Sequence, residues 1–291
     1  MNKLKIAIAS GKGGTGKTTI AVNLYQTLAK QSGPKPLLVD CDVEEPNDAL
    51  FFADSEVVEK TIITHLVPEI NVEKCTFCRK CVEYCEFNAI TVIPPVNHAE
   101  VSSDLCHSCG ACVHACEFDA ITEHPVEIGE MTRYKLPVGE GLIEGSLKVG
   151  LAFQTPVIRH IKQETRMHEG ITIYDAPPGT SCSVVSTLAD VEFVVLVTEP
   201  TPFGLHDLKL AVDLARELKK PIGVVINKAN LGDDKVYKYL EKENIPLLAE
   251  IPFQRNIAEL YSENIHLIDA IPGYDKYFEH MMDHIFDILK S

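Results

Sequence analysis

Cysteines are the residues in this sequence whose type and spacing point most clearly to chemistry. Eight of the ten lie between Cys75 and Cys116, in two copies of a C-x-x-C-x-x-C-x-x-x-C pattern. Thiolates ligate soft metals and iron–sulfur clusters. Disulfides are rare in cytosolic proteins, and the N-terminus lacks the apolar stretch and cleavage site of a secretory signal peptide. The clustering therefore predicts metal centres rather than scattered core thiols.

Both cysteine runs fit the spacing of bacterial two-cluster ferredoxins. In that pattern the first three cysteines of a run bind one [4Fe–4S] cluster and the fourth binds the other. One cluster is therefore assigned to Cys75, Cys78, Cys81 and Cys116. The second cluster is assigned to Cys106, Cys109, Cys112 and Cys85. Two zinc sites are the alternative, because C-x-x-C pairs also suit tetrahedral zinc, but zinc does not require the repeated spacing.

Each cysteine run departs from the ferredoxin pattern at one place. Ferredoxin runs usually continue with proline, whereas Glu86 and Glu117 follow the last cysteines here. The substitution leaves the thiolates in place. It puts negative charge near the clusters, which would tend to lower their potentials.

A glycine-rich segment near the N-terminus predicts phosphate binding. Residues 11–18, GKGGTGKT, match the P-loop pattern G-x-x-x-x-G-K-[ST] between a predicted strand and a predicted helix. Glycines let backbone N–H groups point at phosphate oxygens, and the helix N-terminus adds partial positive charge. Lys17 should reach the β- and γ-phosphates, and the Thr18 hydroxyl should bind Mg²⁺. The expected nucleotide-binding residues are Gly11, Gly13, Gly14, Thr15, Gly16, Lys17, Thr18 and Thr19.

Lys12 is not needed in an ordinary P-loop. The stretch KGGTGKT resembles the deviant Walker A motif of the MinD/ParA/Mrp ATPases and the nitrogenase iron protein. In that family the first lysine reaches across a dimer interface to the nucleotide of the partner subunit, and Lys12 is the matching residue. The resemblance covers roughly residues 3–66 and 145–290. It implies a homodimer that sandwiches ATP, with Lys12 and Lys17 as catalytic residues.

The segment Leu37–Asp42 resembles the second acidic motif of the same family, at the end of a strand. The resemblance implies that Asp42 orients or activates the attacking water, with Asn47 as a helper polar residue. Asp40 is expected among the Mg²⁺ ligands. Phosphoryl transfer requires mostly positioning and charge neutralisation, which such residues provide. A lone D-x-D more often caps a loop, and its pairing with the P-loop favours the catalytic interpretation.

Two later regions also resemble this family. Residues 175–180, DAPPGT, follow a buried strand and resemble Walker B with switch II. The resemblance implies that Asp175 holds Mg²⁺ through water and that Gly179 senses the γ-phosphate. Asn227, at the end of another strand, matches the adenine-reading asparagine. Residues 251–253 resemble the later adenine-side loop, which puts Pro252 at the nucleotide.

Two cysteines lie outside the runs. Cys41 is interpreted as a small buried hydrophobe. Cys182 lies seven residues after Asp175, the offset at which the nitrogenase iron protein has one of its cluster ligands. No cysteine between Cys116 and Cys182 matches the second such ligand, so a subunit-bridging cluster of that type is not predicted. Two Cys182 thiols across a dimer axis remain an alternative metal site.

Strand-like and helical segments alternate over most of the chain, and they must position these residues. Short β-branched runs read as buried strands at Leu4–Ala9, Leu37–Asp40, Ile171–Tyr174, Phe193–Val197 and Ile222–Ile226. Apolar residues with helical spacing come directly after the P-loop and predict a helix there. A second predicted helix ends before Pro221. The alternation predicts an α/β fold, a doubly wound, mostly parallel P-loop sheet with ligands at the carboxyl ends of its strands.

The alternation is interrupted where the cysteines lie. Residues 71–92 align with residues 102–123 at an offset of 31, which suggests a pseudo-twofold module. We therefore expect a P-loop ATPase domain of residues 1–67 and 125–291, with an inserted α+β ferredoxin-like domain of residues 68–124.

Charge and hydropathy exclude some classes of partner. The formal net charge is −15, which argues against nucleic acid, and no run of 18 apolar residues could span a bilayer. The C-terminal segment has helical apolar spacing but an acidic polar face, so it should pack on its own domain rather than bind membrane. The sequence predicts a soluble, cytoplasmic protein.

Together these features predict an Mg²⁺-dependent ATPase with two [4Fe–4S] clusters, whose ATP cycle gates electron transfer to an unidentified partner protein. An Mrp-like carrier that hands clusters or metal to client proteins is the first alternative. A positioning ATPase like ParA or MinD is the second, and the acidic charge counts against it. The chain as a whole resembles MinD-superfamily ATPases with an inserted ferredoxin domain, which are often named cobyrinic acid a,c-diamide synthases. The sequence has no glutamine amidotransferase triad that would support amidation.

Overall fold

The structure is a computed structural model that describes residues 3–290. The chain divides into two compact units. The first unit comprises residues 3–61, 131–146 and 154–290, and the second comprises residues 62–130 and 147–153. The cysteine-containing segment, residues 68–124, lies within the second unit.

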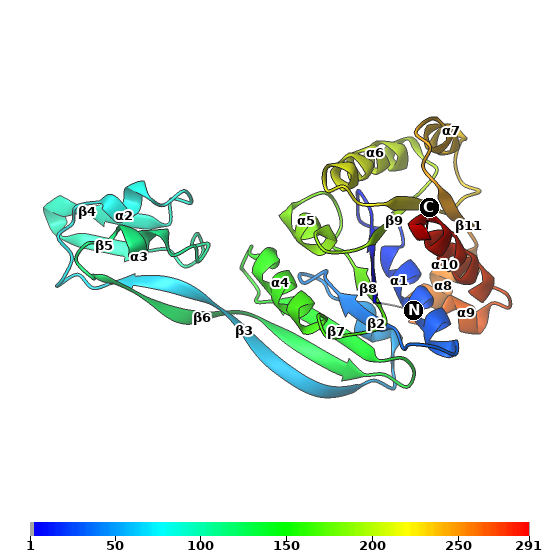
Figure 1. The fold of residues 1–291 in the computed structure, drawn as a ribbon, viewed down its shortest axis with the longest axis horizontal. Helices are drawn as coiled ribbons and strands as arrows, with labels where there is room; N and C mark the ends of the chain where they lie inside the picture. The colour runs from blue at the N-terminus through cyan, green and yellow to red at the C-terminus, as the bar shows by residue number, and fades with distance from the viewer. Residues whose placement is uncertain (1–2, 291) are drawn as a thin grey trace. The chain divides into compact units, whose positions relative to one another are not determined.

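A nine-stranded sheet has the order β11-β10-β9-β1-β8-β2-β7-β6-β3 (Figure 1). From β11 to β7 every neighbouring pair is parallel. This confirms the predicted α/β fold with a mostly parallel sheet. The strands are β1 (Leu4–Ala9), β2 (Leu37–Asp40), β3 (Glu56–Ile70), β6 (Ile121–Lys135), β7 (Gly141–Leu147), β8 (Ile171–Asp175), β9 (Phe193–Thr198), β10 (Ile222–Asn227) and β11 (Leu247–Ile251).

Helices cover both faces of the parallel part of the sheet (Figure 1). Helices α1 and α10 lie on one face, and α4, α5 and α6 lie on the other. The helices of this unit are α1 (Lys17–Lys30), α4 (Gln154–Glu164), α5 (Cys182–Leu188), α6 (Pro202–Glu217), α7 (Lys235–Lys242), α8 (Arg255–Ser262), α9 (Leu267–Ala270) and α10 (Asp275–Lys290), with the 3₁₀ turn η1 (Asp48–Phe51).

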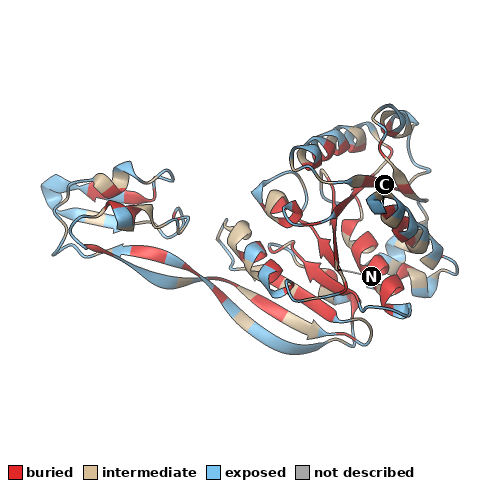
Figure 2. Ribbon diagram, in the orientation of Figure 1, coloured by how far each residue is buried: buried red, intermediate tan, exposed pale blue. Residues whose placement is uncertain are grey.

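The core of the first unit lies along the central strands. β1 and β9 are buried along their whole length, as Figure 2 shows in red. Strands covered on both faces read as continuous apolar runs, which is why the sequence pattern identified them. Helix α10 buries Phe278, Met281 and Ile285 against this core. The C-terminal helix therefore packs on its own domain, as its acidic polar face predicted.

The second unit contains a small antiparallel sheet and two short helices. Strands β4 and β5 pair with Ile90 opposite Val101 and Ile93 opposite His98. Its small core combines Ile90, Val92 and Ile121 with buried cysteines. The elements within this unit are α2 (Lys80–Glu83), β4 (Ile90–Ile93), η2 (Pro94–Val96), β5 (His98–Val101) and α3 (Ala111–Ala115).

The sequence repeat is also a repeat of backbone conformation. The backbone N–H of Asn71 donates to the carbonyl of Ala120, and that of Ser102 donates to the carbonyl of Ala89, both at 2.8 Å. Asn71 and Ser102 are equivalent residues of the two copies, and so are Ala89 and Ala120. Each copy therefore donates the same hydrogen bond to the other. Left-handed backbone recurs at the same offset, at Phe77 and Ser108, Arg79 and Gly110, and Asn88 and Asp119. The two cysteine runs are therefore held in equivalent loops.

Candidate functional site

The P-loop joins β1 to α1 in the first unit. Gly16 has φ of 94° at the helix N-cap, a left-handed conformation that glycine adopts without strain. A Cβ on Gly11 would lie 2.1 Å from the carbonyl oxygen of Asp207, so the close approach of α6 requires glycine there. Thr15 is buried, and its hydroxyl has no hydrogen-bond partner among the described residues. A phosphate oxygen is a suitable partner for such an orphaned hydroxyl.

Thr18 and Asp175 meet at the base of the P-loop. The Thr18 hydroxyl, in the first turn of α1, donates at 2.6 Å to Oδ2 of Asp175, the last residue of β8. Burial raises the pKa of Asp175 to about 6, and the nearby Lys17 opposes the rise. The other carboxylate oxygen of Asp175 is buried without a partner among residues 3–290. A hydroxyl beside a free carboxylate oxygen is a donor set that suits Mg²⁺.

The acidic motif after β2 divides into two roles. Asp40 is buried, and its carboxylate accepts backbone N–H groups of Asp42, Asn47 and Asp48 at 2.9, 2.8 and 3.1 Å. These contacts commit Asp40 to shaping the loop and give no support to its predicted role as an Mg²⁺ ligand. Asp42 is half-buried; partial burial raises its pKa, and Lys17 opposes the rise. Asp42 is therefore the acid of this motif that shares the electrostatic environment of the P-loop lysine.

Asp48 is an acidic residue of the site that the sequence analysis missed. It is fully buried beside Asp40 and Asp175. Burial raises its pKa well above the ordinary value, and the charges of Asp40 and Asp175 raise it further. A cation bound at Thr18 and Asp175 would favour the ionised form of these acids. The sequence signal was only an acidic residue next to Asn47, which does not distinguish a buried carboxyl from an exposed one.

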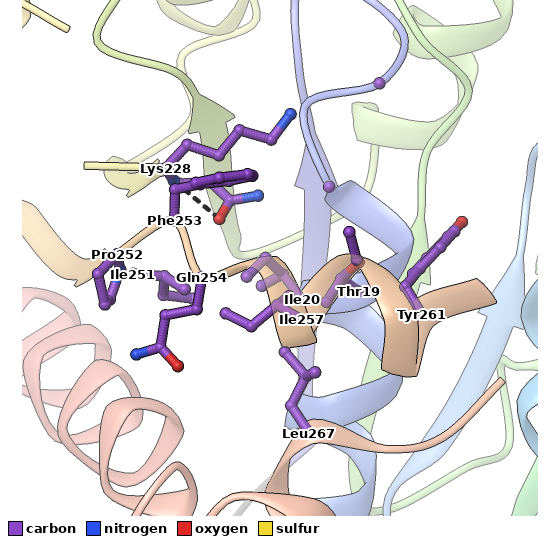
Figure 3. A pocket seen from close by; sticks show the side chains of 14 residues that line it. Thr19, Ile20, Lys228, Ile251, Pro252, Phe253, Gln254, Ile257, Tyr261 and Leu267 are labelled. Carbon is purple, nitrogen blue, oxygen red and sulfur yellow. Dashed lines mark hydrogen bonds between the residues drawn. The ribbon is translucent and has the colours of Figure 1, made fainter. Parts of the chain in front are cut away.

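A cavity of about 260 Å³ lies beside the P-loop (Figure 3). Three sides of it come from α1, from the end of β10 and from the segment after β11. The sequence analysis predicted five of its lining residues, Gly14, Gly16, Thr19, Asn227 and Pro252. Ile251 and Phe253 flank Pro252 in the predicted adenine-side loop and also line the cavity. The lining residues that the sequence analysis missed are Ile20, Lys228, Gln254, Ile257, Ala258, Tyr261 and Leu267.

The cavity has the character of a nucleoside site. Its walls are mostly apolar, and the Asn227 amide provides a polar group at one side. In this conformation Asn227 Nδ2 donates to the Thr15 carbonyl at 2.8 Å, and Asn227 Oδ1 accepts the backbone N–H of Lys228 at 2.9 Å. Aromatic and apolar walls with a few directed polar groups are typical of sites for flat ligands such as a nucleobase.

Lys12 is held within its own chain by Glu199. The ammonium of Lys12 lies 3.7 Å from Glu199 Oε2, and Lys228 lies 2.6 Å from Glu199 Oε1. The Glu199 side chain is only 14% exposed, just after the end of β9. Glu199 therefore joins the lysine of the deviant motif to a lysine of the nucleoside cavity.

We expect Glu199→Gln to strengthen ATP-dependent dimerisation by up to about fivefold. A partly exposed ion pair contributes on the order of 0.2–1 kcal/mol, and its loss frees Lys12 to reach a partner subunit. Sedimentation of the wild-type and variant chains with a non-hydrolysable ATP analogue measures this constant. The matched control is E199Q combined with K12A, which should show no gain. Weaker dimerisation of E199Q would mean that Glu199 supports the dimer instead of restraining Lys12.

Two cavities in the second unit are each lined by four cysteines. One is lined by Cys75, Cys78, Cys81 and Cys116. The other is lined by Cys85, Cys106, Cys109 and Cys112. Each cavity thus takes three cysteines from one run and the fourth from the other run, the grouping that the ferredoxin spacing predicts.

Backbone amides point at the sulfur atoms in these loops. The N–H of Phe77 donates to Cys75 Sγ at 3.4 Å, and the N–H of Ser108 donates to Cys106 Sγ at 3.5 Å. Phe77 and Ser108 are equivalent residues of the repeat. Burial raises the pKa of the Cys106 thiol, and the hydrogen bond from the Ser108 N–H opposes that rise. Hydrogen bonds of this kind would favour the thiolate form of a ligand to a bound cluster.

Within residues 3–290 no three His, Cys, Asp or Glu side chains surround one point closely enough to hold a metal ion. The two clusters, and the zinc sites that are their alternative, stay predictions. Glu117 forms an ion pair with Lys80 at 2.6 Å between two exposed side chains, so a positive charge lies beside one of the two glutamates that follow the runs.

The two remaining cysteines differ in exposure. Cys41 is fully buried, and burial raises the pKa of its thiol. Cys182 is exposed at the first residue of α5. Cys41 is therefore inert in this conformation, as predicted for a small buried hydrophobe, and Cys182 is accessible to reagents and ligands.

The sheet, the P-loop and the adjoining cavity define a P-loop nucleotide-binding protein. A family model described as "CobQ/CobB/MinD/ParA nucleotide binding domain" matches residues 6–268. The chain therefore belongs to this family.

Similar proteins agree with the family. The uncharacterized protein MJ0578 of Methanocaldococcus jannaschii is 34% identical over 272 residues, 92% of this chain and 91% of that protein. An iron–sulfur cluster carrier protein of Pyrococcus furiosus is 25% identical over 283 residues, 91% of this chain and 79% of its own length. The septum site-determining protein MinD of Pyrococcus horikoshii, solved with Mg-ADP, has a TM-score of 0.58 at 18% identity and covers 97% of this chain and 96% of its own. The last comparison shows a shared fold.

None of the helices between residues 3 and 290 combines the length and the apolarity that crossing a bilayer requires.

Proposed function

We propose that this protein is an ATPase that binds two [4Fe–4S] clusters and uses its ATP cycle to gate electron transfer to a partner protein. The observation that carries the proposal is the pair of four-cysteine cavities in a chain that also has a P-loop and a nucleoside cavity. The clusters, when bound, supply one-electron transfer.

The residues of the first unit have separate tasks in the proposed ATPase. The P-loop amides and Lys17 bind and neutralise the phosphates, while Thr18 and Asp175 would hold Mg²⁺. Asp42 orients the attacking water, and Gly179, whose N–H donates to the Ser10 carbonyl at 3.0 Å, responds to the γ-phosphate. In the homodimer that we propose, Lys12 leaves Glu199 and reaches the nucleotide of the partner subunit.

A continuous segment connects the nucleotide site to the first cysteine run. Tyr261 lines the nucleoside cavity, and its ring lies 5.2 Å from that of Phe51. Phe51 ends η1, and β3 begins five residues later at Glu56 and runs to Ile70, shortly before Cys75. A nucleotide that repacks Tyr261 therefore acts on the strand that leads to the cysteine cavities.

The test of gating is an anaerobic redox titration, followed by electron paramagnetic resonance, with and without ATP and Mg²⁺. We expect at least one cluster potential to shift by about 60 mV or more, which corresponds to a tenfold reciprocal change in nucleotide affinity. Lys17→Ala is the control and should show no shift with nucleotide. If the potentials of both clusters are the same with and without nucleotide, nucleotide binding is not directly coupled to cluster reduction and the proposed gating is wrong.

A second candidate function, cluster delivery to client proteins, is favoured by the relatives named as iron–sulfur cluster carrier proteins. A carrier releases its cargo, whereas an electron-transfer protein retains it. Incubating the loaded protein with an apo-ferredoxin, with and without ATP, separates the two. ATP-dependent loss of iron and sulfide to the acceptor would favour the carrier.

A further inference from the structure

Helices α4 and α5 pack together in the first unit but leave an open groove of about 550 Å³ between them. A cavity of this size falls in the range of small-molecule sites. No residue of the groove lines the nucleoside cavity or either cysteine cavity. Its charged side chains and its thiol are those of Arg159, Lys162, Arg166, Asp190 and Cys182.

Two guanidinium groups on one wall of the groove have no counter-ion. Arg159 and Arg166 are exposed, and within residues 3–290 neither side chain takes part in an ion pair or hydrogen bond. The chain as a whole has a formal net charge of −15, with 42 acidic residues available against 27 lysines and arginines. In such an acidic chain, two arginines in one groove without acidic partners indicate a site that can accept an anionic ligand.

The only acidic residue of the groove is already neutralised. Asp190 pairs with Lys162 and accepts a hydrogen bond from Lys5 at 2.7 Å. Burial alone would raise the pKa of Asp190, but the two ammonium groups outweigh it and hold the pKa below its ordinary value. Asp190 therefore stays charged and balanced by lysines, and it leaves Arg159 and Arg166 free for a ligand.

The same lysine fixes the shape of the groove. The Lys162 side chain is 7% exposed, and its ammonium donates to the carbonyls of Ser186 and Thr187 at 2.9 and 2.6 Å. These bonds join α4 to the end of α5. The two helices are therefore joined at this point before a ligand arrives, which lowers the entropic cost of binding.

The other polar groups of the groove also favour an acceptor-rich ligand. Thr155 and Ser186 offer hydroxyls, and Gln163 offers an amide. The exposed residues at the two ends of α5, Cys182 at its start and Ala189 just after its end, have small side chains, so a ligand can lie close to that helix. The hydroxyls and the amide can donate to an anion as well as accept, and the two guanidinium groups beside them can only donate.

We propose that the α4–α5 groove binds a small polyanion with at least two carboxylate or phosphate groups, which Arg159 and Arg166 hold beside the Cys182 thiol. Two guanidinium groups, rather than one, require a ligand with more than one charge. The site is separate from the nucleotide and cluster sites and does not depend on the proposed function.

Cys182 provides the readout, because it is the exposed thiol outside the cysteine runs. Cluster-loaded protein without nucleotide is alkylated with anionic iodoacetate or neutral iodoacetamide, and the Cys182 peptide is quantified by mass spectrometry. The measured quantity is the ratio of the alkylation rate with iodoacetate to the rate with iodoacetamide. We expect this ratio to be about threefold or more higher for Cys182 than for a free thiol, since local positive charge concentrates anions. R159Q/R166Q should abolish this preference.

Titration with citrate and with pyrophosphate, at ionic strength matched with NaCl, then identifies the class of anion. We expect half-protection of Cys182 from iodoacetamide below about 1 mM of one of them, weakened by about tenfold or more in R159Q/R166Q. K242Q/K276Q removes the same charge from other exposed helix positions and should protect like wild type. If neither anion protects Cys182 of the wild-type protein, the proposal is wrong, whether or not R159Q/R166Q folds. The proposal is also wrong if K242Q/K276Q loses as much protection of Cys182 as R159Q/R166Q does.

Discussion

Replacing Cys116 by alanine is expected to remove the cluster of the first cysteine run, not the cluster of its own run. Cys116 lines the cavity of Cys75, Cys78 and Cys81, while Cys106 belongs to the other cavity. Iron should fall from about eight to about four atoms per chain, since each [4Fe–4S] cluster needs all four thiolates. Iron and sulfide analysis with electron paramagnetic resonance measures the loss.

Double variants decide which cysteines share a cluster. If the cavities show the true grouping, C75A/C116A disrupts one site and keeps about four irons, whereas C106A/C116A disrupts both and keeps none. A grouping by run gives the reverse, because Cys106 and Cys116 would then hold the same cluster. Cys182→Ala is the matched control outside the cavities and should keep about eight irons. Retention of iron by C106A/C116A would contradict the crossed arrangement.

The sequence predicted the five central parallel strands, β10, β9, β1, β8 and β2, because burial on both faces leaves a local signature. β1 and β2 begin and end as predicted, at Leu4–Ala9 and Leu37–Asp40. The long strands β3 and β6 were not predicted. Pro68 and Pro125, next to the expected domain boundaries, lie inside these strands. Proline is tolerated on edge strands, and β3 is the outermost strand of the sheet, which accommodates Pro68. The expected boundaries marked where the strand–helix alternation stops, and strands that continue past that point give no such signal.

The site was predictable where its residues are contiguous and not where distant segments meet. The P-loop and the cysteine runs are short motifs whose spacing carries their chemistry. Glu199 reaches Lys12 across 187 residues of sequence, and Tyr261 joins the cavity from α8. Neither carries a local pattern. Sequence spacing also does not show that the Asp40 carboxylate accepts hydrogen bonds from backbone amides. Nor does it show that Asp48 is buried, since burial is decided by tertiary packing.

Lys17→Ala is expected to lower the ATPase kcat/KM by at least about 10²-fold, because loss of one preorganised charge at a transferring phosphoryl group has effects of this order. Two consequences follow from the structure. The buried Lys17 no longer neutralises the phosphates, and its opposition to the raised pKa values of Asp42 and Asp175 is lost. Nucleotide binding should therefore fail together with hydrolysis. Calorimetric titration with ATP and a phosphate-release assay measure the two effects.

Lys12→Ala separates binding from catalysis and completes this test. Lys12 contacts Glu199 rather than the base of the P-loop, so a single chain without it keeps Lys17, Thr18 and Asp175 in place. K12A should bind ATP within about threefold of wild type yet lose hydrolysis nearly as fully as K17A, since a charge from the partner subunit supplies transition-state stabilisation. If K12A instead loses ATP affinity in proportion to hydrolysis, Lys12 acts within its own chain and the proposed ATP-sandwiched homodimer is wrong. If K12A hydrolyses ATP at the wild-type rate, the lysine of the deviant motif has no catalytic part here.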